Sequence, residues 1–225
     1  MKTVRLIEVF NFTWQGEARD SGKKMLLLRF KRCNRVFNEN SCEFCDTKIK
    51  MKISQESEYP INDLQLMIEE NNLAVLISGG EPTFDLNLHG TVNIINNTKS
   101  YLYNVETNGY QLPELISQVN KNKNVRYVLS PKLFSYEDVT FYKDLIEKVK
   151  DNEKVDIKLV YQGSVFNDNF LDYLTEIKFD NNRIWLMPEG TTREDLLHNA
   201  PKVFDAAEKY KTNFSSREHI VYQFT

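Results

Sequence analysis

Three cysteines are the residues of this chain with the clearest chemical purpose. They are Cys33, Cys42 and Cys45, and the sequence holds no other cysteine. Three thiolates cannot all pair as disulfides, and a structural zinc site normally needs four protein ligands. Three thiolates can bind three corners of a cubane iron–sulfur cluster, which leaves the fourth iron open to another ligand. The spacing therefore predicts a [4Fe-4S] cluster with a reactive open corner.

The main alternative for these cysteines is a zinc knuckle whose fourth ligand is a histidine. The chain has three histidines, at positions 89, 198 and 219, and none has zinc-finger spacing to the cysteines. A histidine distant in sequence could still fold against the thiolates, so zinc stays open as a second interpretation. The cluster is favoured because three thiolates are enough for it.

A glycine pair follows an apolar run of the sequence, in the segment Gly79-Gly80-Glu81-Pro82. Glycines at the end of a strand let the backbone approach a ligand closely, and Glu81 and Pro82 would fix the turn. Such a pair alone is most often a tight turn between a strand and a helix. Behind a loop with three cysteines, it indicates a ligand held beside the cluster.

The composition is typical of an ordinary globular protein. The 225 residues are 41% hydrophobic, with 29 basic and 32 acidic side chains, which predicts one domain and favours neither a nucleic-acid nor a membrane surface. No apolar run is long enough to span a bilayer. The N-terminal segment carries charges within its apolar stretch, unlike a signal peptide. Clustered thiols without a secretion signal indicate the cytoplasm.

Short apolar runs alternate with longer segments of helical periodicity. The expected strands are 25–30, 73–78, 101–106, 125–130, 155–161 and 184–187, and the expected helices are 61–71, 112–120, 135–150, 167–178 and 192–210. Thr192 is expected to cap the last helix, and Pro201 to kink or divide it. About six strands alternating with helices predict an α/β fold with a mostly parallel sheet, as a partial barrel or an open sheet.

Polar clusters stand just after four of the expected strands. They begin at Cys33, Ser78, Glu106 and Ser130. The active site of a parallel α/β sheet lies at the carboxyl ends of its strands, so these clusters are expected to converge on one face.

The order of the cysteines and the following GGEP segment resembles the radical S-adenosylmethionine (SAM) enzymes. The resemblance implies an abbreviated partial (β/α) barrel, in which SAM binds the open iron and the GGEP backbone holds its amino group. An electron from the cluster then cleaves SAM and releases a 5′-deoxyadenosyl radical. The first cysteine gap of this family is commonly three residues. It is eight here, so the insertion 35–41 is expected to bulge outward.

Further segments resemble the 7-carboxy-7-deazaguanine synthases, a family within the radical SAM enzymes. They cover nearly the whole chain and read WQGE at 14–17, LRF at 28–30, DT at 46–47, ETNG at 106–109, SPK at 130–132, MPEG at 187–190 and FSSREH at 214–219. The resemblance implies that the substrate is 6-carboxytetrahydropterin and that ring contraction with loss of ammonia gives 7-carboxy-7-deazaguanine, in queuosine-type 7-deazapurine biosynthesis. It also implies a homodimer and a low-potential electron donor such as flavodoxin.

Residue chemistry agrees with several site assignments that the resemblance implies. Gln15 and Glu17 could read the donors and acceptors of a pterin edge, and Arg29 offers a planar cation to the substrate carboxylate, although a surface ion pair is the usual fate of an arginine. Thr47 matches the family's Mg²⁺ contact. The implied substrate contacts are Gln15, Gly16, Glu17, Arg29, Ser78, His219 and Thr225, the last through the terminal carboxylate. The implied SAM contacts are Asp46, Gly79, Gly80, Glu81, Glu106, Ser130 and Lys132.

The resemblance organises the chain as one radical SAM domain over 1–225, with a cluster-binding loop at 31–50 and a substrate-capping tail at 211–225. Two other functions compete with that of a 7-carboxy-7-deazaguanine synthase. One is a glycyl-radical activase, which would modify a partner protein. The other is a non-catalytic module that binds zinc or a cluster.

Overall fold

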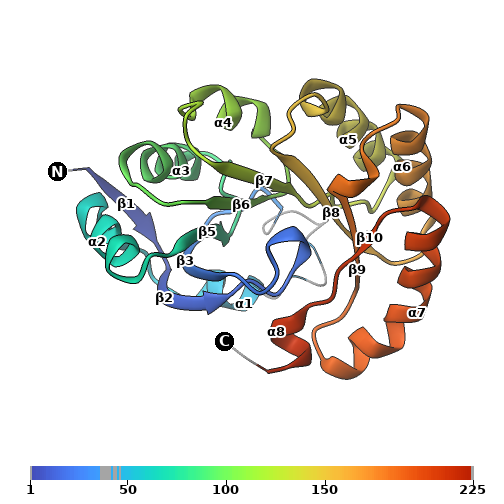
Figure 1. Ribbon diagram of the computed structural model, residues 1–225, viewed down its shortest axis with the longest axis horizontal. Coiled ribbons are helices and arrows are strands. Elements are labelled where there is room, and N and C mark those ends of the chain that lie inside the picture. Colours follow the sequence, from blue (N-terminus) through green and yellow to red (C-terminus); the bar gives the residue numbers. More distant parts are fainter. Residues whose placement is uncertain (1, 36–41, 43–44, 46, 224–225) are drawn as a thin grey trace. The chain divides into compact units, whose positions relative to one another are not determined.

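The computed structural model describes residues 2–35, 42, 45 and 47–223. Contacts between residues divide the chain into two compact units (Figure 1). Unit 1 comprises residues 1–15 and 23–128, and unit 2 comprises residues 16–22 and 129–225. A short segment near the N-terminus thus belongs with the C-terminal part of the chain.

Unit 1 is built on five strands in the spatial order β7-β6-β5-β3-β2, with a separate antiparallel pair of β1 and β4. β3 pairs in parallel with β5, and β5 with β6, whereas β2 runs antiparallel to β3. The strands are β1 Thr3–Leu6, β2 Glu8–Trp14, β3 Lys24–Phe30, β4 Ser57–Pro60, β5 Ala74–Gly79, β6 Tyr103–Thr107 and β7 Val125–Leu129. The helices are α1 Lys48–Ile53, α2 Ile61–Asn71, α3 Leu86–Asn97 and α4 Leu112–Gln118.

Unit 2 has three parallel strands in the order β10-β9-β8. They are β8 Val155–Tyr161, β9 Ile184–Pro188 and β10 Asn213–Phe214. The helices are α5 Tyr136–Val149, α6 Val165–Glu176, α7 Arg193–Tyr210 and α8 Glu218–Val221, with 3-10 turns η1 Ala18–Asp20 and η2 Asn181–Arg183. Within the unit, α7 packs along β9 and β10, and α5 packs against α6.

The strands that carry the site are buried on both faces, as parallel strands between layers are. In β5, the consecutive residues Ala74, Val75, Leu76 and Ile77 are all buried, and in β3 the same holds from Met25 to Leu28. The α/β class with mostly parallel strands is therefore confirmed. Each of the six strands expected from the sequence corresponds to an observed strand, and the span of β8 agrees at both ends.

The expected helices are also present, and the last of them corrects one detail. Thr192 caps α7 as predicted, since its Oγ1 accepts a hydrogen bond from Asp195 N at 3.1 Å. Pro201 does not divide the helix, which runs unbroken from Arg193 to Tyr210. Several elements were not predicted, among them β1, β2, β4, β10, α1, α3 and α8.

Helix α3 escaped prediction because its sequence, LNLHGTVNIINN, is rich in asparagine and β-branched residues and contains a glycine. These residues have weak helix propensity. Gly90 has a packing reason to be there, because a Cβ at this position would lie 2.9 Å from both Phe30 Cε1 and Val4 Cγ2. Tertiary packing against β1 and β3 therefore decides the helix.

Candidate functional site

The cysteine segment begins directly after β3. Cys33, Cys42 and Cys45 are all free thiols of intermediate exposure. Cys45 N donates a hydrogen bond to Cys42 O at 3.3 Å, which forms a turn between these two cysteines. Cys33 Sγ accepts from Arg35 N at 3.5 Å. Residues 36–41 of the insertion 35–41 lie outside the described residues, as do residues 43, 44 and 46. The expected outward bulge of the insertion therefore remains a prediction.

Burial raises the pKa of the Cys33 thiol to about 11, and the negative charges of Glu81, Cys42 and Cys45 act in the same direction. A thiol in this environment stays protonated until a cation binds, because metal coordination is what deprotonates a ligating thiol. Among the described residues, no group of three His, Cys, Asp or Glu side chains is close enough to hold a metal ion. The charges of Cys42 and Cys45 act on the Cys33 thiol, so the three cysteines belong to one region of the chain's surface.

Gly79 and Gly80 pack against the backbone that leads to Cys33. Gly79 has φ +105°, and a Cβ there would lie 2.6 Å from Phe30 N. A Cβ on Gly80 would collide with the carbonyl of Arg32. Two hydrogen bonds close this contact, from Gly80 N to Phe30 O and from Glu81 N to Arg32 O, both at 2.7 Å. The glycine pair therefore sets the direction in which the chain leaves β3 towards the cysteines.

Glu81 joins the loop after β5 to the loop after β6. Its buried carboxylate accepts hydrogen bonds from Thr83 N at 2.9 Å, Thr83 Oγ1 at 2.7 Å, Thr107 Oγ1 at 2.5 Å and Asn108 N at 2.6 Å. Burial raises the pKa of Glu81, and these donors act against the rise. Asn108 in turn donates from Nδ2 to Asn34 Oδ1 at 2.8 Å, beside Cys33. The loops after β3, β5 and β6 thus form one hydrogen-bonded unit.

Two of the predicted site residues donate to the carboxylate of a third, Glu106, at the end of β6. Gln15 Nε2 donates to Glu106 Oε1, and Ser78 Oγ donates to Glu106 Oε2, each at 3.2 Å. These residues come from the chain after β2, from β5 and from β6. The group combines an amide, a hydroxyl and a carboxylate, which can bind hydroxyl and amino groups of a ligand.

Arg29 lies near the end of β3 and contacts two residues of unit 1. Its Nε donates to Glu8 Oε2 at 2.6 Å, and its Nη1 donates to Thr47 Oγ1 at 3.0 Å. Lys50 Nζ pairs with the other oxygen, Glu8 Oε1, at 2.7 Å. Burial opposes ionisation of Glu8, yet the hydrogen bonds from Lys50 and Arg29 outweigh it and lower the pKa of Glu8. Arg29 and the buried Thr47 are therefore neighbours.

In unit 2, Glu17 forms the centre of a buried charged group. Its Oε2 is paired with Lys158 Nζ, and its Oε1 accepts from Arg217 Nε at 2.9 Å. His219 Nε2 lies 4.0 Å from the same Oε1. Burial opposes ionisation of Glu17, but the charges of Lys158, Arg217 and His219 outweigh it and hold the pKa of Glu17 well below its ordinary range.

Gly16 lets the C-terminal segment approach this group closely. A Cβ on Gly16 would lie 2.8 Å from His219 N, and Glu218 N donates to Gly16 O at 2.9 Å. Ser215 Oγ accepts from Ala18 N at 2.7 Å. Gly16, Glu17 and His219 were all predicted to contact substrate, and the structure brings these three together.

Two further predicted residues form a pair after β7. Lys132 Nζ donates to Ser130 Oγ at 2.9 Å, and Ser130 is buried. Asp46, predicted to contact SAM, and Thr225, predicted to contact the substrate, lie outside the described residues.

Sequence reasoning missed Glu8, Asn108, Lys158 and Arg217 as functional candidates. Lys158 left a usable signal, because a lysine inside the apolar run of β8 must find a partner when that strand is buried. Asn108 and Arg217 stand within the segments 106–109 and 214–219 that carry the resemblance, but their partners could not be read from the sequence, since Arg217 meets Glu17 across 200 positions. Glu8 left no such signal.

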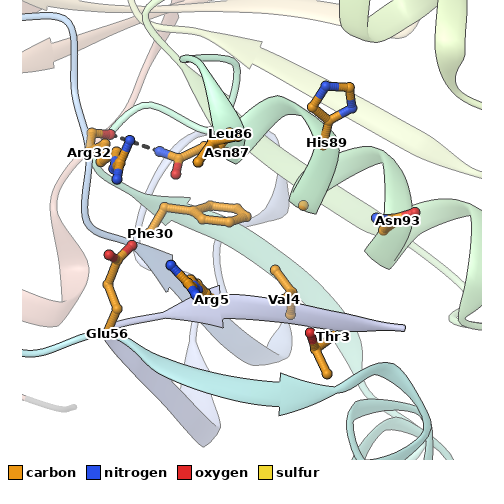
Figure 2. A pocket seen from close by; sticks show the side chains of 11 residues that line it. Thr3, Val4, Arg5, Phe30, Arg32, Glu56, Leu86, Asn87, His89 and Asn93 are labelled. Atoms are coloured by element: carbon orange, nitrogen blue, oxygen red, sulfur yellow. Dashed lines mark hydrogen bonds between the residues drawn. The ribbon is translucent and has the colours of Figure 1, made fainter. Parts of the chain in front are cut away.

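The cavity drawn in Figure 2 lies apart from these groups. Its volume is about 170 Å³, and its walls come from β1, the end of β3 and the start of α3, with Val4, Phe30 and Gly90 among them. Asn87 donates there to Arg32 O at 2.9 Å and reaches Glu81 O at the same distance. None of the residues assigned a role from the sequence lines this cavity.

No family model matches the chain. A curated 7-carboxy-7-deazaguanine synthase from Hyperthermus butylicus is 24% identical over 230 residues, which cover 98% of this chain and 93% of that protein. The structure of QueE from Escherichia coli matches with a TM-score of 0.60 and 19% identity, over 96% of this chain and 95% of that one. Streptococcus suis SuiB bound to S-adenosylmethionine matches with a TM-score of 0.54 and 18% identity, over 83% and 48% of the two chains. These findings confirm the expected fold and the resemblance on which the site assignments were based.

Proposed function

We propose that this chain is a radical SAM enzyme that converts 6-carboxy-5,6,7,8-tetrahydropterin to 7-carboxy-7-deazaguanine with loss of ammonia, in queuosine-type 7-deazapurine biosynthesis. The observation that carries the proposal is the likeness to a curated synthase of that name over nearly the full length of both chains. The fold of E. coli QueE, matched over 96% of this chain, supports it. The reaction class is a carbon–nitrogen lyase that depends on Mg²⁺.

The chain has residues that fit the cofactors of such an enzyme. Cys33, Cys42 and Cys45 would hold a [4Fe-4S] cluster, since all three are free thiols and no other cysteine competes for iron. When bound, the cluster and SAM would supply the radical that removes hydrogen from the carbon bearing the substrate carboxylate. The SAM contacts that we propose are Asp46, Gly79, Gly80, Glu81, Glu106, Ser130 and Lys132.

The local geometry suggests different tasks for the SAM contacts. Glu106 is suited to accept hydrogen bonds from ribose hydroxyls, because a carboxylate offers about four acceptor sites and Ser78 and Gln15 hold it in place by one bond to each oxygen. Glu81 is engaged by four donors of the chain, so its task would be to hold the glycine loop in place for the ligand. Lys132 would neutralise a carboxylate beside Ser130.

The proposed substrate contacts are Gln15, Gly16, Glu17, Arg29, Ser78, His219 and Thr225. Arg29 would bind the substrate carboxylate, and Thr47 would supply a hydroxyl oxygen to a Mg²⁺ ion at the same carboxylate. Support comes from the 3.0 Å hydrogen bond between Arg29 Nη1 and Thr47 Oγ1. Glu17 would accept hydrogen bonds from the pterin amino and ring N–H groups.

The remaining parts of the proposal concern organisation and partners. The catalytic domain would comprise residues 1–225, with residues 31–50 as the cluster-binding loop and 211–225 as a tail over the substrate. A low-potential reductant such as flavodoxin would deliver the electron, and the working form would be a cytoplasmic homodimer that binds neither nucleic acid nor membrane. Among the described residues, no helix is long and apolar enough to cross a membrane.

The test is anaerobic reconstitution with iron and sulfide, followed by mass spectrometry of the products formed from the carboxypterin and SAM. The proposal expects about four iron and about four sulfide per chain, and a product with the mass of 7-carboxy-7-deazaguanine. One zinc without sulfide would support the binding module instead. A loaded cluster that cleaves SAM but leaves the pterin unchanged would point to a different radical SAM reaction.

A further inference from the structure

Lys158 is an unusual residue for the middle of a strand. It lies in β8, whose sequence is VDIKLVY, and only 4% of its surface is exposed. A lysine is seldom buried to this degree unless a carboxylate pairs with it. Its Nζ forms an ion pair with Glu17 Oε2, 141 positions earlier in the chain. The strand therefore holds a cation directly against Glu17.

Arg217 approaches Glu17 from a second element. Its Nε donates to Glu17 Oε1 at 2.9 Å, and its Nη1 donates to Gly190 O at 2.8 Å. Because the guanidinium is planar, the bond to Gly190 also fixes the direction of the Nε–H towards Glu17. Each carboxylate oxygen of Glu17 is thus engaged by a separate cation, one from β8 and one from the segment before α8.

We propose that Lys158 and Arg217 are positioning residues that fix Glu17 as an ionised group able only to accept hydrogen bonds, and that Glu17 thereby selects a pterin over analogues that lack its 2-amino group. The inference rests on the proposed function and deepens it. Neither cation needs to touch the substrate, since each acts through Glu17.

The selectivity follows from the chemistry of a carboxyl group. An ionised carboxylate accepts only, whereas a protonated carboxyl also donates and can satisfy an oxo group. A pterin presents an amino group and a ring N–H, while a lumazine carries an oxo group in place of the amino group. A carboxylate that faces this oxo group meets a second acceptor in place of a donor, and sites built to accept from a substrate N–H discriminate strongly against analogues that lack it. Among the described residues of unit 2, Lys158 and Arg217 face Glu17 as cations, and His219 adds a positive charge there when it is protonated.

The experiment measures inhibition of the reconstituted full-length enzyme by 6-carboxytetrahydrolumazine, together with the KM for 6-carboxytetrahydropterin, between pH 6 and pH 8.5. Wild type should prefer the pterin by about 100-fold or more at every pH. Lys158→Met removes the cation on Oε2 and leaves Arg217 on Oε1, so burial should raise the pKa of Glu17 relative to wild type. The preference should then fall by about 10-fold or more at pH 6 and partly recover at pH 8.5. Lys158→Arg, which keeps the cation, should restore a preference that does not vary with pH.

Two more variants control for folding. Lys202→Met removes an exposed lysine of unit 2 and should behave as wild type. The double variant Glu17→Gln/Lys158→Met removes both charges of the buried pair, so it should fold even if Lys158→Met does not. It should discriminate no better than Glu17→Gln alone.

The outcomes separate this inference from the proposed function. A folded Lys158→Met enzyme with the wild-type preference at all pH values would overturn the inference and leave the proposed function standing. The same holds if the double variant retains the wild-type preference. A wild-type enzyme that forms no 7-carboxy-7-deazaguanine would refute the proposed function, and the inference with it.

Discussion

Replacing Glu81 by glutamine tests whether this side chain holds the loops of the cluster region together. Glu81 Oε1 accepts three hydrogen bonds, from Thr83 N, Thr83 Oγ1 and Thr107 Oγ1, whereas Oε2 accepts one, from Asn108 N. A glutamine will keep its oxygen where three donors converge, so its NH₂ must face the N–H of Asn108. The substitution therefore exchanges one acceptor for a donor and leaves the rest of the shape unchanged.

The expected loss of stability in Glu81→Gln follows from this single mismatch at Asn108 N. A buried N–H without an acceptor costs about 1–3 kcal/mol, and hydrogen bonds to a charged group contribute about 1.5–3 kcal/mol each. Allowing for relief of the buried charge, we expect Glu81→Gln to lower the free energy of unfolding by about 2–4 kcal/mol. With a urea dependence of about 2–3 kcal/mol per molar, the urea midpoint should fall by about 0.7–2 M.

The assay is urea unfolding at pH 8, with amide hydrogen exchange at Asn108 as a local measure. Exchange at Asn108 should become faster in the variant, because its N–H loses its acceptor. Glu69→Gln serves as the matched control, since Glu69 is an exposed residue of α2 and should change stability by less than about 0.5 kcal/mol. If Glu81→Gln is no more destabilised than this control, the ionised carboxylate does not join the loops as argued.

Three other substitutions address the rest of the site. Cys42→Ala should abolish both the brown chromophore and turnover after reconstitution, and retention of four irons per chain would contradict its role as a ligand. Arg29→Ala should keep the cluster and weaken substrate binding by about 10- to 100-fold, the effect of losing a charged hydrogen bond; an unchanged affinity would remove Arg29 from the site. Glu8→Gln should destabilise the chain at pH 7, and the difference from wild type should shrink as the pH falls below 4.5. The reason is that the pKa of Glu8 is lowered in the folded state, so its contribution is present above the ordinary value of 4.5 and is lost as pH falls through the folded pKa. Urea midpoints measured at pH 7 and below pH 4.5 test this pH dependence, with the exposed Glu70→Gln as control. A difference between Glu8→Gln and wild type that stays constant with pH would refute it.

The sequence predicted the helices and strands whose pattern of apolar residues is strong. Helix α2 agrees with the expected span 61–71 because Ile61, Leu64 and Ile68 recur at helical spacing and are all buried. Strand β8 agrees because five of its seven residues are apolar or aromatic and β-branched residues begin it. Local signals of this kind need no knowledge of the partner element.

The elements that the sequence did not predict depend on packing. In α3, local propensity opposes a helix, and contacts of Gly90 with Phe30 and Val4 decide the outcome. Strand β2 is different, because Phe10, Phe12 and Trp14 alternate with polar residues, and this local pattern is typical of a strand although the three aromatics are about 40% exposed.

The candidate site shows the same limit. Cysteine spacing and the glycine pair indicated which residues carry chemistry, because those residue types are rarely grouped for another reason. Their supporting partners could not be inferred, since Glu8 reaches Arg29 across 21 positions and Lys158 reaches Glu17 across 141. Pairings of that kind depend on the register of strands, which no local pattern reports.

The membership of residues 16–22 in the second unit has a practical consequence for dissecting this protein into fragments. Expression of residues 129–225 alone would deprive Lys158 and Arg217 of the carboxylate of Glu17, and two buried cations would then repel each other. A truncated gene would need residues 16–22 supplied by circular permutation, or as an added peptide, before its product could reach the native arrangement.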